Sequence, residues 1–282
     1  MRVDIVGVNG SMGSGKDSLY MNFFGPLGYI RYAFATPLYE IAKLQYDIKC
    51  NNSREYSKHS LHNKFVEIAG GKASVSYADA YTFVEEDLPR IAKETDLYSD
   101  LSLDRKPRKF LQQVGTDYFR KQIGENVWCA YLVAKIIADL RKELADYYDS
   151  LENEEANLVL IGSGSNVRAV NRSKDFVRKI YVSDLRFENE VSTVALLPNN
   201  ITYALEIPAS AKLIKLDVSK DTILQRVEER DMFSKEDIEK TLGHDSEHSI
   251  NNNMFDIVCD ANQSQDILYE DLDNKLKGFL WW

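Results

Sequence analysis

The sequence predicts an α/β fold in which a mostly parallel sheet is flanked by helices. Short apolar runs, typical of buried strands, alternate along the chain with longer segments of helical spacing. A glycine-rich segment, GSMGSGKDS at residues 10–18, links the first run to the first helix. With 282 residues, 44% of them hydrophobic, the chain is long enough for one large α/β domain with insertions.

Residues 10–18 have the composition of a phosphate-binding loop. The run 3–8 before them predicts a buried strand, and the run 19–24 after them predicts a helix. Three glycines allow a tight turn whose backbone N–H groups point inward, and Lys16 adds a positive charge for the β- and γ-phosphates. A glycine-rich turn without a ligand is the alternative, and the strand, lysine and helix around the glycines argue against it.

The last position of the G-x-x-x-x-G-K-[ST] pattern differs in this chain. Asp17 stands where the pattern has a hydroxyl that contacts Mg²⁺, and Ser18 follows one residue later. A carboxylate beside bound phosphates repels them unless it points away or acts through the metal. The residues alone therefore leave open which side chain ligates Mg²⁺.

Composition excludes several classes of protein. The net charge of −9 argues against a protein whose main task is to hold nucleic acid, because that affinity comes largely from Lys and Arg. No apolar run approaches the ~20 residues that cross a bilayer, and no signal-peptide pattern precedes the first strand, so we expect a cytoplasmic protein. Cys50, Cys129 and Cys259 lie far apart without a CxxC pair, which predicts buried free thiols.

The segment after the first helix predicts a second strand at residues 28–34, followed by a turn and a helix that begins near Pro37. Residues 36–40 should therefore lie at the carboxyl edge of the sheet, beside the phosphate loop. Residues 47–106 are polar and irregular apart from one helical segment at 77–92, and they predict an inserted, mobile helical subdomain.

Two further helices are expected before the middle of the chain. The first begins near residue 107 and carries Arg108 and Lys109 in its first turn, where basic side chains oppose the helix dipole unless a phosphate partner offsets the cost. A solvated basic face explains the pair equally well. The second helix should run from about residue 125 to 148, with Trp128 near its start.

A basic stretch follows the strand expected at residues 158–161. Its sequence fits either a flexible basic loop over a phosphate site or an ordinary solvated loop. The basic residues are Arg168, Arg172, Lys174, Arg178 and Lys179.

Asp184 ends a short buried strand, and Arg186 and Glu190 follow in a turn and a helix start. An aspartate at the carboxyl end of a strand beside a phosphate loop can hold Mg²⁺ directly or through water. An arginine two residues later can pair with a phosphate through two parallel hydrogen bonds. A surface Asp–Arg ion pair is the alternative, and the phosphate loop favours the functional interpretation.

A lid-like region is expected at about residues 219–250. The helix predicted at 222–230 carries Arg226 and Arg230 on one face, which suits a segment that closes over nucleotide phosphates. Ion pairing with neighbouring acidic residues is the alternative. The remaining expected elements are two strands and a closing helix, at residues 211–218, 255–260 and 266–279.

A competing motif, HDSEH at residues 244–248, has the H-x-x-E-H spacing of inverted zinc proteases. Gly243 precedes it, three asparagines follow soon after, and no distant third ligand is evident. A loop with hydrogen-bonding groups near a nucleotide fits these neighbours better.

Together, these motifs resemble those of the deoxynucleoside monophosphate kinases of tailed bacteriophages. The order of the motifs and their approximate spacing agree with that family over most of the chain. In that family the loop commonly reads G-K-D followed by a hydroxyl, which makes Asp17 a family feature and Ser18 the hydroxyl nearer the metal. The matching residues are Gly15-Lys16-Asp17-Ser18, Ala35-Thr36-Pro37-Leu38, Arg108, Leu111-Gln112, Gly115-Thr116-Asp117, Trp128, Asp184-Leu185-Arg186-Phe187, Glu190, His244 and Ser246-Glu247.

The resemblance implies one P-loop kinase domain over residues 1–282, with a nucleoside monophosphate kinase-like fold and an acceptor-binding insertion. The implied reaction moves the γ-phosphoryl group of ATP to a deoxynucleoside monophosphate with the help of Mg²⁺. The implied ATP site is Gly13, Gly15, Lys16, Asp17 and Ser18, to which the lid adds Arg226 and Arg230. The implied deoxynucleotide site is Leu38, Tyr39, Arg108, Gly115, Thr116, Trp128, Asp184, Arg186, Glu190 and Ser246.

Within these sets, the implied catalytic residues are Lys16, Arg108, Asp184 and Arg186, and the metal ligands are Ser18 and Asp184. Tyr39 departs from the family, which can carry a basic side chain there. The segments 47–106, 149–178 and 198–210 do not align with the family.

Three alternatives stay open. The acceptor can be dephospho-coenzyme A or a nucleoside, and the protein can be a switch or scaffold that holds ATP without an acceptor. The expected partners are small nucleotides, without a nucleic-acid polymer or a membrane, in the host cytoplasm if a phage encodes the chain. Base preference and the choice between monomer and homodimer are beyond the reach of the sequence.

Overall fold

The structure is a computed structural model, which describes residues 1–11, 13–36, 120, 124–152, 158–161, 168–171, 176–231 and 250–279. The chain divides into two compact units, Met1–Arg31 with Ile136–Trp282, and Tyr32–Lys135. The predicted subdomain at residues 47–106 lies outside the described residues and stays a prediction.

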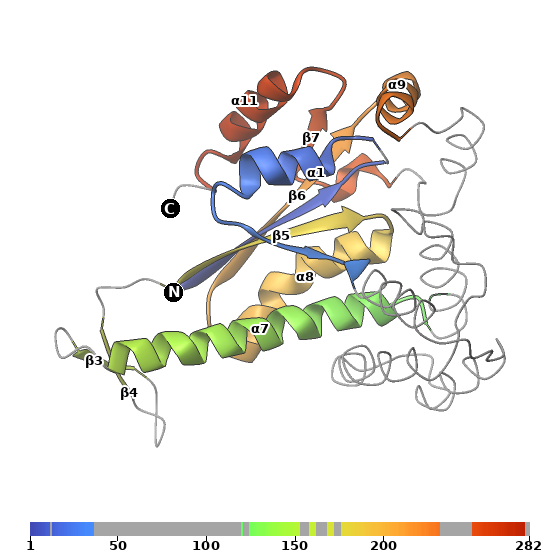
Figure 1. The fold of residues 1–282 in the computed structure, drawn as a ribbon. Helices are drawn as coiled ribbons and strands as arrows, with labels where there is room; N and C mark the ends of the chain where they lie inside the picture. The colour runs from blue at the N-terminus through green and yellow to red at the C-terminus, as the bar shows by residue number, and fades with distance from the viewer. Residues whose placement is uncertain are drawn as a thin grey trace, which may run out of the picture. The chain divides into compact units, whose positions relative to one another are not determined.

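A five-stranded parallel sheet is the central element of the fold, with the strand order β2-β5-β1-β6-β7 (Figure 1). Renumbered along the chain, this order is 2-3-1-4-5. The predicted α/β fold class is therefore confirmed. The strands are β1 (Arg2–Asn9), β2 (Ile30–Ala33), β5 (Val177–Leu185), β6 (Ala209–Asp217) and β7 (Ile257–Asp260).

Helices connect the strands, because a parallel pair needs a crossover that returns the chain to the same end of the sheet. The last helix closes the chain after β7. The helices are α1 (Lys16–Leu19), which continues into the π-helical turn η1 (Tyr20–Phe24), α7 (Val127–Glu152), α8 (Glu188–Leu205), α9 (Lys220–Asp231) and α11 (Gln265–Leu276).

The strand β1 lies at the centre of the sheet and is buried on both faces. Its apolar side chains Val3, Ile5, Val6 and Val8 are all 0% exposed, as expected for a central parallel strand. The neighbouring strands β5 and β6 both run parallel to it. This burial fixes the end of β1, and therefore the start of the glycine-rich loop, within the sheet.

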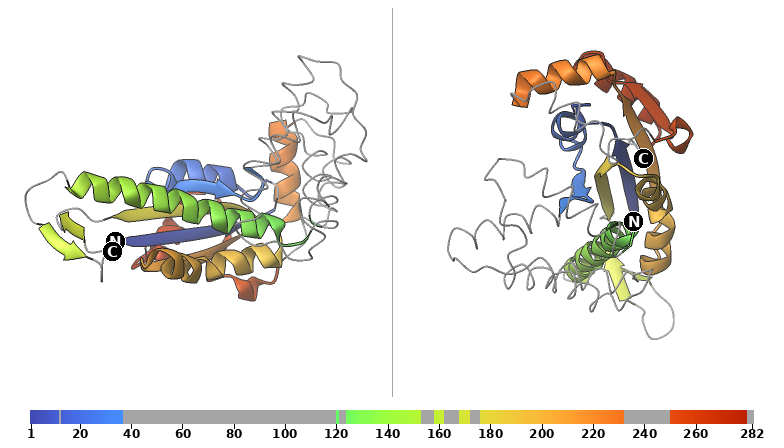
Figure 2. Two further views of the ribbon diagram at one scale, coloured as in Figure 1. Left: turned by 90° about the horizontal axis from the view of Figure 1, so that it is seen from below. Right: turned by 90° about the vertical axis from the view of Figure 1, so that its right-hand side faces the viewer.

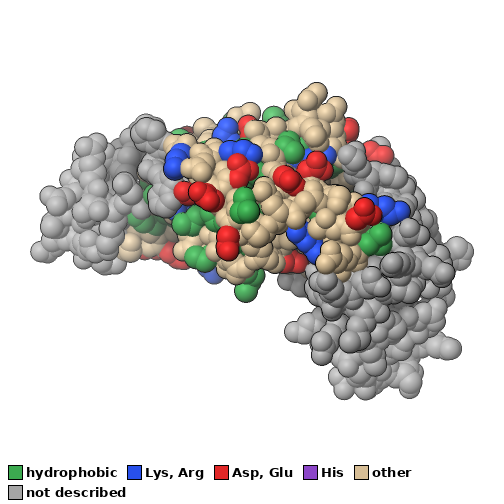
Figure 3. Space-filling model, turned by 90° about the horizontal axis from the view of Figure 1, so that it is seen from above, with side chains coloured by type: hydrophobic (Ala, Val, Ile, Leu, Met, Phe, Trp, Pro, Cys, Tyr) green, Lys and Arg blue, Asp and Glu red, His purple; other side chains and the backbone are tan. Residues whose placement is uncertain are grey.

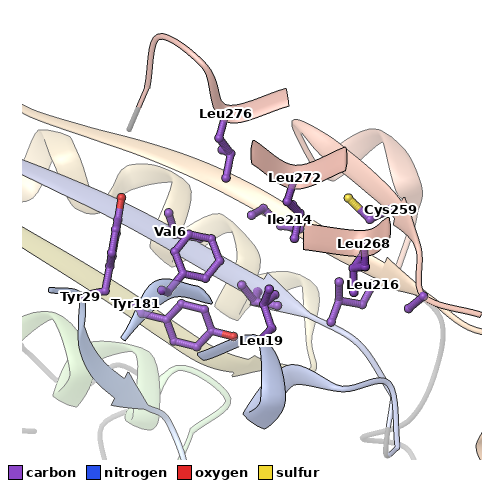
Figure 4. Packing of buried hydrophobic residues seen from close by; sticks show 13 residues of the cluster. Val6, Leu19, Tyr29, Tyr181, Ile214, Leu216, Cys259, Leu268, Leu272 and Leu276 are labelled. Atoms are coloured by element: carbon purple, nitrogen blue, oxygen red, sulfur yellow. The ribbon is translucent and has the colours of Figure 1, made fainter. Parts of the chain in front are cut away.

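Helices cover both faces of the sheet (Figure 2). On one face, side chains of α1, η1 and α11 pack in one buried cluster with alternate residues of the strands (Figure 4). Val6, Tyr181 and Ile214 contribute from β1, β5 and β6. On the other face α8 packs against β1, where a Cβ built on Gly7 lies 2.9 Å from Val194 Cγ1. The glycine-rich loop thus leads into a helix whose side chains are part of the core.

The basic stretch is partly strand, so neither loop expectation holds for its last residues. Arg178 and Lys179 lie in β5, where Arg178 pairs with Glu143 and Lys179 Nζ donates to the Leu27 carbonyl at 3.2 Å. Arg168 begins β4, which forms an antiparallel hairpin with β3. Arg172 and Lys174 lie outside the described residues. The hairpin strands are β3 (Leu158–Ile161) and β4 (Arg168–Asn171).

Several compositional expectations can be compared with the structure. Cys129 and Cys259 are free and buried, as predicted, and burial raises the pKa of Cys259 to about 11. Cys50 lies outside the described residues. No helix within the described ranges is long and apolar enough to cross a membrane. On the described part of the face in Figure 3, acidic and basic side chains are interspersed.

We predict that Gly7→Ala destabilises the fold. A Cβ at this position would lie 2.8 Å from Leu213 Cδ2 and 2.9 Å from Val194 Cγ1, so the neighbours must move apart. Overpacking of this kind costs about 1–3 kcal/mol, measurable as a lower urea midpoint. The control Ala195→Ser adds one atom on the exposed side of α8 and should lower the midpoint much less, because only helix propensity is lost, about 0.5 kcal/mol. Equal midpoints for both variants would contradict the prediction.

Candidate functional site

The glycine-rich segment forms a tight loop between β1 and α1. Gly13 and Gly15 have φ angles of 76° and 95°. Residues other than glycine rarely adopt this left-handed conformation. Ser14 N donates to the Ser11 carbonyl at 3.2 Å, and Leu19 N donates to the Gly15 carbonyl at 2.8 Å to begin the helix. The loop therefore has the backbone geometry that the motif predicts.

Lys16 lies with its ammonium group inside the loop. Its Nζ donates to the carbonyl oxygens of Gly10 and Ser11, the latter at 2.9 Å, and the residue is only 9% exposed. Its own carbonyl accepts a hydrogen bond from the buried Tyr181 hydroxyl at 3.1 Å. The Lys16 side chain, which the motif assigns to phosphates, is thus hydrogen-bonded within the loop. Tyr181 of β5 holds the Lys16 backbone through its hydroxyl.

The helix α9 packs against the same loop. Arg226 Nη1 lies 3.5 Å from the Gly13 carbonyl oxygen, and a Cβ on Gly13 would lie 3.0 Å from Val227 Cγ2. The predicted lid residue Arg226 therefore lies beside the glycine-rich loop. Arg230 belongs to α9, but its side chain lies outside the described part of the chain.

Asp184 stands near the carboxyl end of β5 in a rare backbone conformation. Its φ of 63° is uncommon for a residue with a side chain. The register between β1 and β5 shifts at this point, where Asn9 pairs with Leu185 and its side-chain amide donates to the Leu185 carbonyl. Backbone strain of this kind concentrates at functional sites, because the surroundings must hold it in place.

Glu190 secures the turn that follows Asp184. Its carboxylate accepts the backbone N–H groups of Arg186 at 2.6 Å and Phe187 at 3.2 Å, and the residue is 2% exposed. Arg186 Nη2 approaches Asp184 Oδ1 at 4.0 Å. These contacts give Glu190 a structural task, and its assignment to the deoxynucleotide stays a prediction.

Arg31 is the residue of this site that the sequence analysis missed. From β2, its Nη2 contacts Asp17 Oδ1 at 2.7 Å and Asp184 Oδ2 at 3.9 Å, and its Nε donates to the Ser183 hydroxyl at 3.0 Å. Burial lowers the pKa of Arg31, but Asp17 and Asp184 outweigh this effect, so the pKa lies above its ordinary value. A charged residue inside an otherwise apolar strand was the available signal.

The carboxylates of the site suit Mg²⁺. The ion prefers hard oxygen ligands and commonly binds one or two carboxylates together with waters and substrate phosphates. Asp17 and Asp184 both lie within 4.0 Å of Arg31, and Ser18 follows Asp17 in α1. Among the described residues, no group of three or more His, Cys, Asp or Glu side chains forms a metal cage. The residues therefore fit an ion that phosphates help to hold.

Several predicted site residues stay predictions. Trp128 is described in α7 and is 2% exposed, so it is a buried residue whose contact with a nucleotide stays a prediction. The motif at residues 244–248 lies outside the described residues. The same is true of Leu38, Tyr39, Arg108, Gly115, Thr116 and Ser246.

Comparison with known proteins identifies no family for this chain. No protein-family model and no curated protein matches the chain. Among solved structures, the crystal structure of TT1252 from Thermus thermophilus is similar over 99% of this chain and 97% of that one, with 12% identity and a TM-score of 0.38. Similarity at this level assigns neither a family nor a substrate.

We predict that Gly15→Ala weakens ATP binding while Gly28→Ala does not. Both glycines have positive φ, 95° and 83°, and an added Cβ meets no described atom within 4 Å at either position. Each substitution should therefore cost a similar ~1–2 kcal/mol of backbone strain. Only Gly15 lies in the loop, so calorimetric titration with ATP should separate the variants. Equal affinities would show that the loop geometry does not serve ATP.

We predict that Glu190→Ala destabilises the fold by about 2 kcal/mol, because two backbone donors lose their acceptor. Urea unfolding measures the effect. Glu188→Ala, which removes an exposed acidic residue from the same first helical turn, serves as the control. A midpoint for Glu190→Ala that matches this control would contradict the structural task.

Proposed function

We propose that the protein is a deoxynucleoside monophosphate kinase, which transfers the γ-phosphoryl group of ATP to a deoxynucleoside 5′-monophosphate and releases ADP. The observation that carries this proposal is the position of Asp184 and Arg186 at the end of the strand next to the phosphate-binding loop. A loop alone is compatible with an ATP-binding switch. The added carboxylate and arginine favour a second phosphate group at the same edge of the sheet.

The loop is the proposed donor site. Phosphoryl transfer depends mainly on positioning and on neutralising charge, so it needs backbone N–H groups, a lysine, arginines and a metal ion, without an activated nucleophile. Lys16 is proposed to leave its carbonyl partners and follow the transferring phosphoryl group. Arg226, which lies 3.5 Å from the Gly13 carbonyl, is proposed to assist from α9.

The end of β5 is the proposed acceptor side. Arg186 is proposed to bind the acceptor phosphate together with Arg108, and Asp184 to organise Mg²⁺ or the acceptor. When bound, Mg²⁺ would neutralise charge on the β- and γ-phosphates. The choice of a deoxynucleotide over other acceptors rests on the resemblance of the sequence motifs to the phage family.

The proposal predicts acceptor-dependent formation of ADP from Mg·ATP. Each of the four common deoxynucleoside monophosphates is offered in turn, with ribonucleotides, dephospho-coenzyme A and nucleosides as rival acceptors. Lys16→Ala should fold normally and lose about 100-fold or more in turnover, because a charge on the transferring phosphate is then unbalanced. A coupled assay for ADP measures the rates.

The matched control is Lys212→Ala, which removes a lysine of β6 whose Nζ pairs with Asp256 at 3.3 Å. This variant should keep the wild-type rate. If only dephospho-coenzyme A or a nucleoside supports turnover, that compound is the acceptor and the deoxynucleotide is not. If ATP binds but no acceptor supports turnover, the result favours an ATP-binding switch protein. Undiminished turnover in Lys16→Ala would reject the loop as the donor site.

A further inference from the structure

Arg31 connects the two halves of the candidate site. Asp17 belongs to the phosphate-binding loop segment and Asp184 to the end of β5, and one guanidinium nitrogen of Arg31 lies 2.7 Å from the first carboxylate and 3.9 Å from the second. The Nε atom holds the Ser183 hydroxyl at 3.0 Å, and the guanidinium lies 5.6 Å from the centre of the Tyr20 ring. Four contacts thus fix the charge between two acidic side chains.

We propose that Arg31 is a positioning residue for nucleotide binding, which neutralises and restrains Asp17 so that the loop accepts phosphates despite a carboxylate beside Lys16. The inference rests on the part of the proposed function in which the loop binds ATP. It does not depend on which acceptor the protein uses.

The reason lies in the charge balance at the loop. Asp17 directly follows Lys16, and its side chain is 64% exposed, so a carboxylate there that turned toward bound phosphates would repel them. Arg31 remains charged at every physiological pH. Its side chain is 31% exposed, and its other contacts lie in η1 and β5, so it restrains Asp17 from a rigid base.

Arginine is suited to this task in a way that lysine is not. The guanidinium uses Nη2 for the carboxylates and Nε for Ser183 at the same time, whereas an ammonium group is a single point charge on a flexible stem. Arg31→Lys should therefore retain the neutralising charge and lose part of the restraint. An intermediate affinity for ATP is the expected result.

The test measures ATP binding by titration calorimetry in EDTA, at low ionic strength, so that metal ligation by Asp17 does not enter. Arg31→Met should weaken binding about fivefold or more relative to wild type. Asp17→Asn should bind at least as tightly as wild type, because it removes the repulsive charge. The double variant Asp17→Asn/Arg31→Met should recover most of the affinity that Arg31→Met loses.

The recovery separates a positioning role from a structural one, because a residue needed only for folding is not rescued by a second change at Asp17. Arg178→Met is the matched control, since it breaks an arginine–carboxylate pair with Glu143 near the opposite end of β5 and should leave ATP binding unchanged. Circular dichroism confirms that each variant folds. If Arg31→Met fails to fold, the affinities of Arg31→Lys and Asp17→Asn decide.

Three results overturn the inference: wild-type affinity in Arg31→Met, a double variant as weak as Arg31→Met, or an Asp17→Asn variant that binds ATP more weakly than wild type. Absence of ATP binding to the wild-type chain rejects both this inference and the proposed function. If the wild-type chain binds ATP and Asp17→Asn restores binding to Arg31→Met, but no acceptor-dependent ADP forms, then only the proposed kinase activity is rejected.

Discussion

The parallel pairing of β1 with β5 is the constraint on which the candidate site depends. Their register runs from Ile5 opposite Ile180 to Asn9 opposite Leu185, so both strands end at the same edge of the sheet. The loop that follows β1 and Asp184 near the end of β5 are neighbours for this reason alone. Because β1 is buried on both faces, the loop begins from one of the most constrained points in the chain.

Among the described residues of this site, cationic side chains outnumber carboxylates, although the chain as a whole has a net charge of −9. Four cationic side chains meet three carboxylates, one of which, Glu190, accepts hydrogen bonds from backbone N–H groups. A basic cluster on an acidic protein concentrates anion binding at one place. The cations are Lys16, Arg31, Arg186 and Arg226, and the carboxylates are Asp17, Asp184 and Glu190.

The features that the sequence predicts well are those encoded within a few residues. The loop and the carboxylate near the end of β5 follow from local patterns, and the five sheet strands follow from apolar runs. The partnership of Arg31 with Asp17 and Asp184 depends on strand order, and the left-handed φ of Asp184 depends on a register shift opposite Asn9. Neither leaves a local pattern. The basic residues Arg178 and Lys179 were misread because their partners, Glu143 and Leu27, are distant in sequence.

The two halves of the proposed reaction therefore differ in how they are encoded. The proposed donor side consists of the glycine-rich loop, α9 and the end of β1, which all adjoin the core of the sheet. The proposed acceptor side adds residues 38–39, 108–116 and 246, which lie outside the described residues, to Asp184 and Arg186 near the end of β5. A core of this kind can serve many acceptors, because function belongs to the site and not to the fold. In the proposed reaction, the edge of the sheet binds the phosphoryl group, and the residues that complete the acceptor side select the compound that receives it.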